Sequence, residues 1–120
     1  MCVDKAQKVL RYVRDGRVIR TIDVNIGPEK GDPWFGQYSS TREGVSRIFE
    51  KYEMTYSNLY GTPMPNYMPF DGGIGFHLSG QTGGTGYETP TYGCVTIRDR
   101  KAMNWLFANT PLKTRVVVYA

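Results

Sequence analysis

Glycine and proline interrupt this sequence at short intervals, and no other feature restricts its fold as strongly. The 120 residues contain 14 glycines and 7 prolines, which favour short strands and turns over long helices. We expect loops where polar residues or chain breakers are densest, at 28–43, 60–73 and 79–91. Regular secondary structure is therefore expected in the short stretches between these segments.

Between these breaks, the apolar residues follow the spacing of β-strands. Ile22, Val24 and Ile26 alternate with polar residues, so one face of that strand is buried and the other contacts water. The preceding strand, 8–14, is followed by the Asp-Gly pair at 15–16, which is typical of a tight hairpin. Further apolar runs predict strands at 44–52, 74–78, 95–97 and, as an inner strand, 116–119.

One helix is expected in the last quarter of the chain. Met103, Leu106 and Phe107 have the spacing of one helix face, and Asp99 can cap the N-terminus. Many short strands and one helix predict a mainly β fold, a small sandwich or barrel with one covering helix. A chain of this length usually forms one domain, so we expect a single domain over 1–120.

The charge and the small number of metal-binding side chains exclude several function classes. Fifteen basic and eleven acidic residues give a net charge of +4, a mild excess that does not indicate a nucleic-acid partner. One histidine and two cysteines cannot form a Cys₂His₂ zinc site. No apolar run approaches the roughly 18 residues of a membrane-spanning helix, and residues 1–20 are too polar for a signal peptide.

The strongest local signal for chemistry is a histidine followed by a cysteine. His77 is the only histidine, and residues 78–93 separate it from Cys94 in a segment that can fold the two side chains together. A thiol needs a neighbouring base to become a nucleophilic thiolate, and a neutral imidazole is such a base. Gly93 permits a sharp turn that would let the N–H groups of Gly93 and Cys94 point at a developing oxyanion.

These residues alone leave a second interpretation open. A cysteine between apolar residues is more often buried and inert, and a lone histidine is more often a satisfied structural side chain. The chain order does separate this pattern from papain-like and NlpC-type cysteine hydrolases, in which the cysteine precedes the histidine.

The segment around Cys94 resembles the signature of the L,D-transpeptidase catalytic domain, also called the YkuD domain. That signature is a histidine, a spacer in the mid-teens, then Ser or Thr, His, Gly, Cys, a hydrophobic residue and Asn or Arg. This chain has His77 and then Thr-Tyr-Gly-Cys-Val-Thr at 91–96. The resemblance covers nearly all of the chain and is greatest to actinobacterial cell-wall members, through VLRYVRDGRVIRTIDVNIG, TREGVSRI, TPMPNYMPFDGGIGFH, IRDRKAMNWLF and VVVY.

Two positions depart from that signature. Tyr92 stands where the family has its second histidine, and Thr96 stands where it has Asn or Arg. The positions of the nucleophile and the base, Cys94 and His77, are retained. The resemblance therefore implies an enzyme with the β-sandwich or barrel fold of the L,D-transpeptidase catalytic type.

The resemblance implies a two-step reaction on peptidoglycan. His77 would take the proton of Cys94, whose thiolate would attack the peptide bond after the third residue of a tetrapeptide stem, releasing D-alanine and leaving a thioester. An amine of a second stem would then form a 3→3 cross-link, whereas water would give L,D-carboxypeptidase activity. The resemblance also implies no metal or other cofactor, no nucleic-acid partner, and covalent inhibition by carbapenem β-lactams.

The resemblance also implies roles for residues around the reacting pair. A backbone carbonyl near Leu78 would orient His77. The substrate would contact apolar walls from the 60–73 loop and polar side chains near the cysteine, although proline–aromatic packing and a solvated arginine are the alternative interpretations. The residues with an implied role are Tyr92, Gly93 and Cys94 for the backbone oxyanion hole, and Tyr67, Met68, Phe70, Thr91, Thr96 and Arg98 for substrate binding.

Four further expectations complete the sequence-based interpretation. A sortase-like transpeptidase, which also uses His, Cys and Arg, is an alternative, but its interval between His and Cys is much longer. A wall-binding module that has lost activity is a second alternative, consistent with Tyr92 and Thr96. Cys2 is expected to be structural, without a disulfide to Cys94. Because peptidoglycan lies outside the membrane and no export signal is visible, we expect a trimmed catalytic core of an extracytoplasmic protein.

Overall fold

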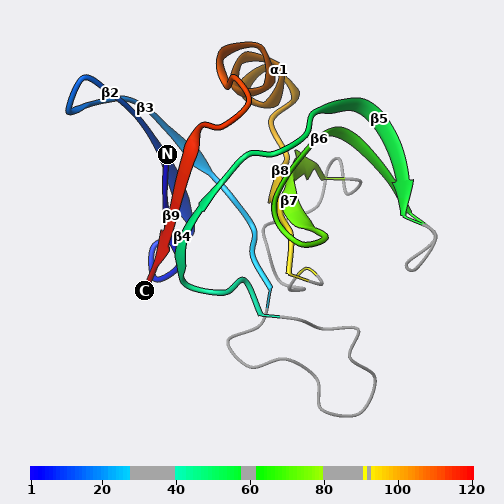
Figure 1. Ribbon diagram of the computed structural model, residues 1–120, viewed down its shortest axis with the longest axis horizontal. Helices are drawn as coiled ribbons and strands as arrows, with labels where there is room; N and C mark the ends of the chain where they lie inside the picture. Colours follow the sequence, from blue (N-terminus) through cyan, green and yellow to red (C-terminus); the bar gives the residue numbers. More distant parts are fainter. Residues whose placement is uncertain (28–39, 58–61, 80–90, 92) are drawn as a thin grey trace.

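The computed structural model describes residues 1–27, 40–57, 62–79, 91 and 93–120. The segments 28–39 and 80–90 of the predicted loops therefore lie outside the described residues. The described part forms two β-sheets and one helix, which lies above the sheets in the view of Figure 1. This arrangement confirms the prediction of a mainly β fold with one helix.

The first sheet pairs the first strand of the chain with the last. In spatial order its five strands are β3 (Arg17–Asp23), β2 (Val9–Arg14), β1 (Cys2–Asp4), β9 (Arg115–Tyr119) and β4 (Gly44–Arg47). β9 pairs in parallel with β1 and antiparallel with β4, which confirms the predicted inner strand. The β2–β3 hairpin turns where Asp15 has a φ of 52° and Gly16 a φ of 76°, the two positive values that a type I′ turn requires.

The second sheet has four strands, in the order β5 (Tyr52–Ser57), β6 (Thr62–Asp71), β7 (Ile74–Leu78) and β8 (Val95–Ile97). β6 pairs antiparallel with both β5 and β7, whereas β7 and β8 run parallel. Parallel neighbours need a long connection outside the ladder. Residues next to β8 therefore lie beside β7 because the two strands pair, although they are distant in the sequence.

The prediction of a loop over 60–73 is wrong, because β6 occupies most of that segment. A proline has no N–H for a ladder, so prolines in sheets lie on edges or at bulges. Pro63 and Pro65 pair only with β5, in the half of β6 that β7 does not reach. Pro69 lies at the register shift between β6 and β7. Each of these three prolines therefore occupies a position where the missing donor costs little.

The predicted single strand over 44–52 is instead two strands, because the chain crosses from one sheet to the other. β4 ends at Arg47 and β5 begins at Tyr52. Between them Ile48 is buried, and its backbone N–H donates to the Thr114 carbonyl at 2.9 Å while its carbonyl accepts from the Lys113 N–H at 2.7 Å. This anchored residue fixes the point of crossing.

The core lies between the sheets and under α1 (Arg100–Asn109). Asp99 caps the helix as predicted, since its side chain accepts from the backbone N–H groups of Lys101 at 2.9 Å and Ala102 at 3.2 Å. Met103 and Leu106 are fully buried, which confirms the predicted apolar face. Among the described residues, no helix has the length and apolar character needed to cross a membrane.

Gly75 lies where β6 and β7 approach most closely. A Cβ at this position would lie 2.5 Å from the Met68 carbonyl oxygen and 2.6 Å from the Pro69 Cα, and these backbone atoms cannot move without disturbing the strand pairing. We expect Gly75→Ala to lower the free energy of unfolding by about 1–3 kcal/mol, as overpacking does, measured by urea denaturation. Gly73→Ala is the control, because nothing lies within 4 Å of that Cβ. Equal losses in both variants would contradict the steric explanation.

Candidate active site

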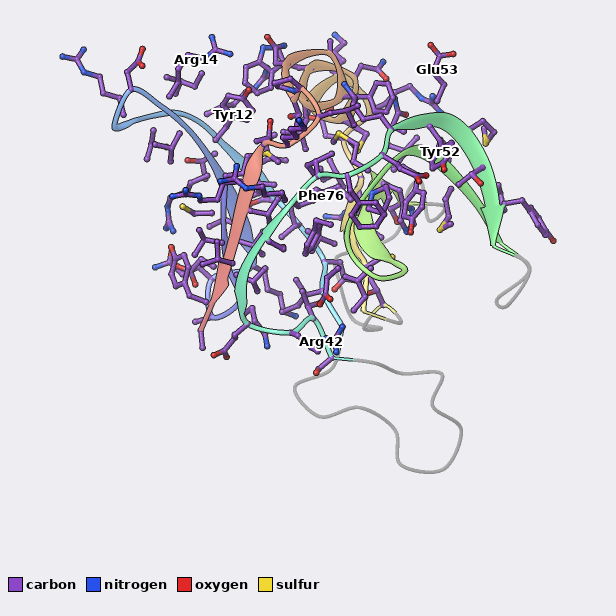
Figure 2. All side chains as sticks on the ribbon, viewed as in Figure 1. Tyr12, Arg14, Arg42, Tyr52, Glu53 and Phe76 are labelled. Atoms are coloured by element: carbon purple, nitrogen blue, oxygen red, sulfur yellow. The ribbon has the colours of Figure 1, made fainter. Side chains whose placement is uncertain are left out.

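The alternation of β7 places His77 on the outer face of the second sheet. Successive residues of a strand point to opposite faces. Phe76 is fully buried in the core between the sheets (Figure 2), so the next side chain, His77, points away from the core. There its ring lies 6.5 Å from the ring of Tyr67, edge to face. His77 is only 8% exposed, so neighbouring groups cover most of the imidazole.

One hydrogen bond fixes the orientation of the His77 ring. Its Nδ1 lies 2.9 Å from the Leu78 carbonyl oxygen, which confirms the predicted orienting carbonyl. Because a carbonyl can only accept, Nδ1 carries the hydrogen and the neutral ring keeps its lone pair on Nε2. Burial lowers the pKa of His77, and the bond to Leu78 opposes part of that effect. His77 is therefore a neutral base at pH 7.

The parallel pairing of β7 and β8 brings Cys94 to the same region. Thr96 lies opposite His77, and Cys94 precedes Thr96 by two residues, about 7 Å along the strand direction. The Cys94 Sγ lies 3.7 Å from the Gly73 carbonyl oxygen. The Tyr67 hydroxyl donates to that same carbonyl at 2.6 Å. The sheet thus gathers Cys94, His77 and Tyr67 on one face.

All three of these side chains are neutral before any reaction begins. Burial raises the pKa of the Cys94 thiol, and a hydrogen bond from the Gly75 backbone opposes part of that rise. The Gly73 carbonyl oxygen, 3.7 Å from Sγ, also favours the protonated thiol. Burial raises the pKa of Tyr67 to about 12, with a smaller contribution from Cys94. Attack by the sulfur therefore requires a proton to leave the thiol, and the Nε2 of His77 can accept it.

A tight turn before Cys94 is closed by Thr91. Gly93 has a φ of 113°, which confirms the need for glycine at this turn. The Gly93 N–H donates to the Thr91 Oγ1 at 3.1 Å, and that hydroxyl donates to the Cys94 carbonyl at 2.5 Å. Thr91, predicted to contact substrate, thus has its hydroxyl within the turn, and the Gly93 amide is engaged there rather than aimed at an oxyanion.

The other predicted site residues divide by the strand face they occupy. Met68 and Phe70 are 0% and 4% exposed and belong to the core, so their predicted role as substrate-pocket walls is wrong: alternation along β6 turns them inward and turns Tyr67 outward. Thr96 is buried, and Arg98 is half-buried between β8 and α1. Their substrate contacts, and the backbone N–H of Cys94 as an oxyanion donor, stay predictions. Tyr92 lies outside the described residues.

The family profile for the L,D-transpeptidase catalytic domain, YkuD, matches residues 1–118. This chain belongs to that family. The assignment confirms the resemblance seen in the sequence and leaves no support for the sortase-like alternative. A comparison with curated proteins gives no match.

Solved structures of L,D-transpeptidases share this fold. The enzyme from Stackebrandtia nassauensis has a TM-score of 0.84 at 24% identity, over 99% of this chain and 54% of that one. The enzyme from Xylanimonas cellulosilytica has 0.80 at 28% identity, over 98% and 58%. An L,D-transpeptidase in complex with imipenem has 0.82 at 13% identity, over 98% and 57%. This chain therefore spans little more than half the length of these relatives.

Two residues of this L,D-transpeptidase domain that the sequence interpretation missed make side-chain hydrogen bonds to the turn before Cys94 or to the end of β6. Thr41 is fully buried; its hydroxyl accepts from the Gly27 N–H at 2.9 Å and donates to the Gly93 carbonyl at 2.6 Å. Arg42, labelled in Figure 2, donates from Nε and Nη2 to the Asp71 carboxylate at 3.0 and 2.6 Å. The only sequence signal was that both belong to the family-like segment TREGVSRI.

The outer face continues from the site onto the β5–β6 hairpin. Tyr52 stacks on Tyr67 with ring centroids 6.2 Å apart and an interplanar angle of 17°. Beyond that pair, Met54 is 63% and Tyr56 57% exposed. Register places Pro65 and Pro63 opposite these two residues. These six residues form a largely apolar, uncharged surface that begins beside His77. We call it the hairpin strip; its members are Tyr52, Met54, Tyr56, Pro63, Pro65 and Tyr67.

Proposed function

We propose that this domain is a peptidoglycan L,D-transpeptidase that forms 3→3 cross-links through a thioester on Cys94. The observation that carries the proposal is the placement of Cys94 and His77 on one face of the second sheet, with His77 Nδ1 held by the Leu78 carbonyl. Membership of the L,D-transpeptidase family supports it.

The first half-reaction makes the thioester. His77 Nε2 takes the thiol proton while Sγ bonds to the carbonyl carbon between the third residue of a stem, a diamino acid, and the fourth, D-alanine. The Cys94 backbone N–H donates to the resulting oxyanion, an interaction worth about 3–4 kcal/mol per donor in comparable sites. When the oxyanion collapses, the C–N bond breaks, and D-alanine leaves with the proton that His77 held. The hairpin strip offers an apolar surface for the aliphatic part of the stem.

The second half-reaction transfers the acyl group. The side-chain amine of a second stem attacks the thioester carbonyl and gives its proton to His77. The C–S bond then breaks, and Cys94 regains a proton from His77. Water in place of the amine gives L,D-carboxypeptidase activity, so the balance between the two products depends on which acceptor reaches the thioester first.

Three further parts of the proposal follow from this chemistry. The donor and acceptor are peptidoglycan stem peptides, which places the reaction outside the cell membrane. Carbapenem β-lactams, which present a strained carbonyl to the same sulfur, should acylate Cys94. A structural neighbour in complex with imipenem supports this expectation.

Mass spectrometry of muropeptides tests the proposal directly. We expect a tetrapeptide muropeptide incubated with the domain to give a dimer that has lost one alanine, and some tripeptide from hydrolysis. Intact mass after exposure to imipenem should show one covalent adduct. Neither product nor adduct, together with binding to peptidoglycan sacculi, would instead support the inactive wall-binding module that Tyr92 and Thr96 leave open.

A further inference from the structure

Thr41 holds the peptide unit that joins Gly93 to Cys94. Its hydroxyl donates to the Gly93 carbonyl at 2.6 Å and accepts from the Gly27 N–H at 2.9 Å. The Thr41 side chain is 0% exposed, so water does not compete for either bond. A second contact lies nearby, since the Thr91 N–H donates to the Ile26 carbonyl at 2.9 Å. The turn before Cys94 is therefore tied to residues 26–27 at two points.

The direction of one carbonyl sets the direction of the next amide. A trans peptide is planar, and its C=O and N–H point in opposite directions. No cis peptide occurs in the described part of the chain. Because Thr41 holds the Gly93 carbonyl toward the interior, the Cys94 N–H must point away from Thr41. On the N-terminal side of Gly93, the hydrogen bond from its N–H to Thr91 Oγ1 limits rotation of the Gly93 backbone. Both neighbouring contacts thus define the orientation of the Cys94 amide.

We propose that Thr41 is a positioning residue that aims the Cys94 N–H at the oxyanion formed when Sγ attacks a carbonyl. The inference rests on the proposed function and adds to it a residue that does not touch substrate. Without the hydroxyl, the buried Gly93 carbonyl and Gly27 N–H lose their partner, and unsatisfied buried groups drive local rearrangement. The peptide between Gly93 and Cys94 can then rotate, because glycine permits many backbone conformations.

Two reactions of the same sulfur separate this role from a general structural one. Imipenem acylation forms an oxyanion, since Sγ adds to the β-lactam carbonyl before the ring C–N bond opens. Iodoacetamide alkylation forms none: Sγ bonds to a saturated carbon, the C–I bond breaks, iodide leaves, and the thiol proton passes to His77 or to solvent. Only the first reaction depends on where the Cys94 amide points.

The test measures both rate constants in Thr41→Val and Thr41→Ser. Loss of an oxyanion donor costs about 10²–10³-fold in rate, so we expect misdirection in Thr41→Val to slow imipenem acylation about 10–100-fold while alkylation changes less than about twofold. Thr41→Ser, which keeps the hydroxyl, should restore acylation to within about threefold of the unchanged protein. Thr110→Val is the matched control, because Thr110 is also 0% exposed and, among the described residues, its hydroxyl donates only to Met1 Sδ, at 3.8 Å.

Several outcomes would overturn the inference. Equal slowing of acylation and alkylation in Thr41→Val would show that the whole site is disturbed, and acylation at the unchanged rate would show that Thr41 does not aim the amide. If Thr41→Val does not fold, Thr41→Ala, which leaves room for water beside the two freed groups, is measured by the same pair of reactions. If the unchanged protein does not react with imipenem, the proposed function is overturned as well. If only the role of Thr41 is wrong, the unchanged protein still reacts with imipenem.

Discussion

Replacing Cys94 with alanine is expected to abolish both the imipenem adduct and every transpeptidation product. The proposed reaction proceeds through a thioester on Sγ, and the only other cysteine of the chain, Cys2, lies in the first sheet. Intact-mass spectrometry measures the adduct, and muropeptide analysis measures the products. Cys94→Ser should also lose transpeptidation, because a hydroxyl is a far weaker nucleophile than a thiolate although it can keep the hydrogen bond to Gly73.

The second thiol of the chain supplies the control for that experiment. Cys2 lies in β1, the central strand of the first sheet, and both cysteines are free. We expect Cys2→Ala to keep one imipenem adduct per molecule. An adduct that persists in Cys94→Ala, or one that disappears in Cys2→Ala, would show that Cys94 is not the nucleophile.

Replacing His77 with glutamine is expected to slow imipenem acylation by about 10²–10⁴-fold at pH 7, the usual contribution of a general base. Glutamine fills much of the same space but cannot accept the thiol proton as a base. Because burial raises the pKa of Cys94, very little thiolate forms without that base. The second-order rate constant of acylation, followed by mass spectrometry, measures the loss.

The pH dependence of acylation distinguishes a reaction that uses His77 as the base from one that depends on thiolate already present in solution. Burial lowers the pKa of His77 below its ordinary value of about 6.5, so the unchanged protein should react at a constant rate near pH 7. Its rate should fall only in more acidic solution, as the base becomes protonated. In His77→Gln the rate should follow thiolate formation and rise steadily above pH 7. The defect should therefore shrink as pH increases; a constant ratio between the two proteins across this range would contradict the role of His77 as base.

The sequence predicted those elements whose local signals agree with their packing. The Asp-Gly pair at 15–16 predicted a hairpin because few other dipeptides accept two positive φ values. Asp99 and the spacing of Met103 and Leu106 predicted α1, because its cap and its buried face lie within one short segment. Both signals are local, so a single chain segment contains all the information they need.

The failures arose where pairing with a distant strand overrides local propensity. The prolines of 60–73 indicated a loop, yet β5 and the bulge against β7 accommodate them in β6. Without that strand, no alternation could be assigned, and Tyr67, Met68 and Phe70 were all placed at the site. The pleat of β6 assigns Tyr67 to the outer face and the other two to the core.

By itself, the sequence determined the mainly β class, the helix at 100–109 and the family resemblance, and it predicted the reacting pair, since the chain offers only one histidine for the family motif. Only the tertiary structure decided that Tyr67 joins His77 and Cys94, and that Thr41 holds the turn before the nucleophile. The physical reason is that these contacts join strands and turns far apart in the chain. Sheet register and buried hydrogen bonds create them, and neither is encoded in any local pattern of residues.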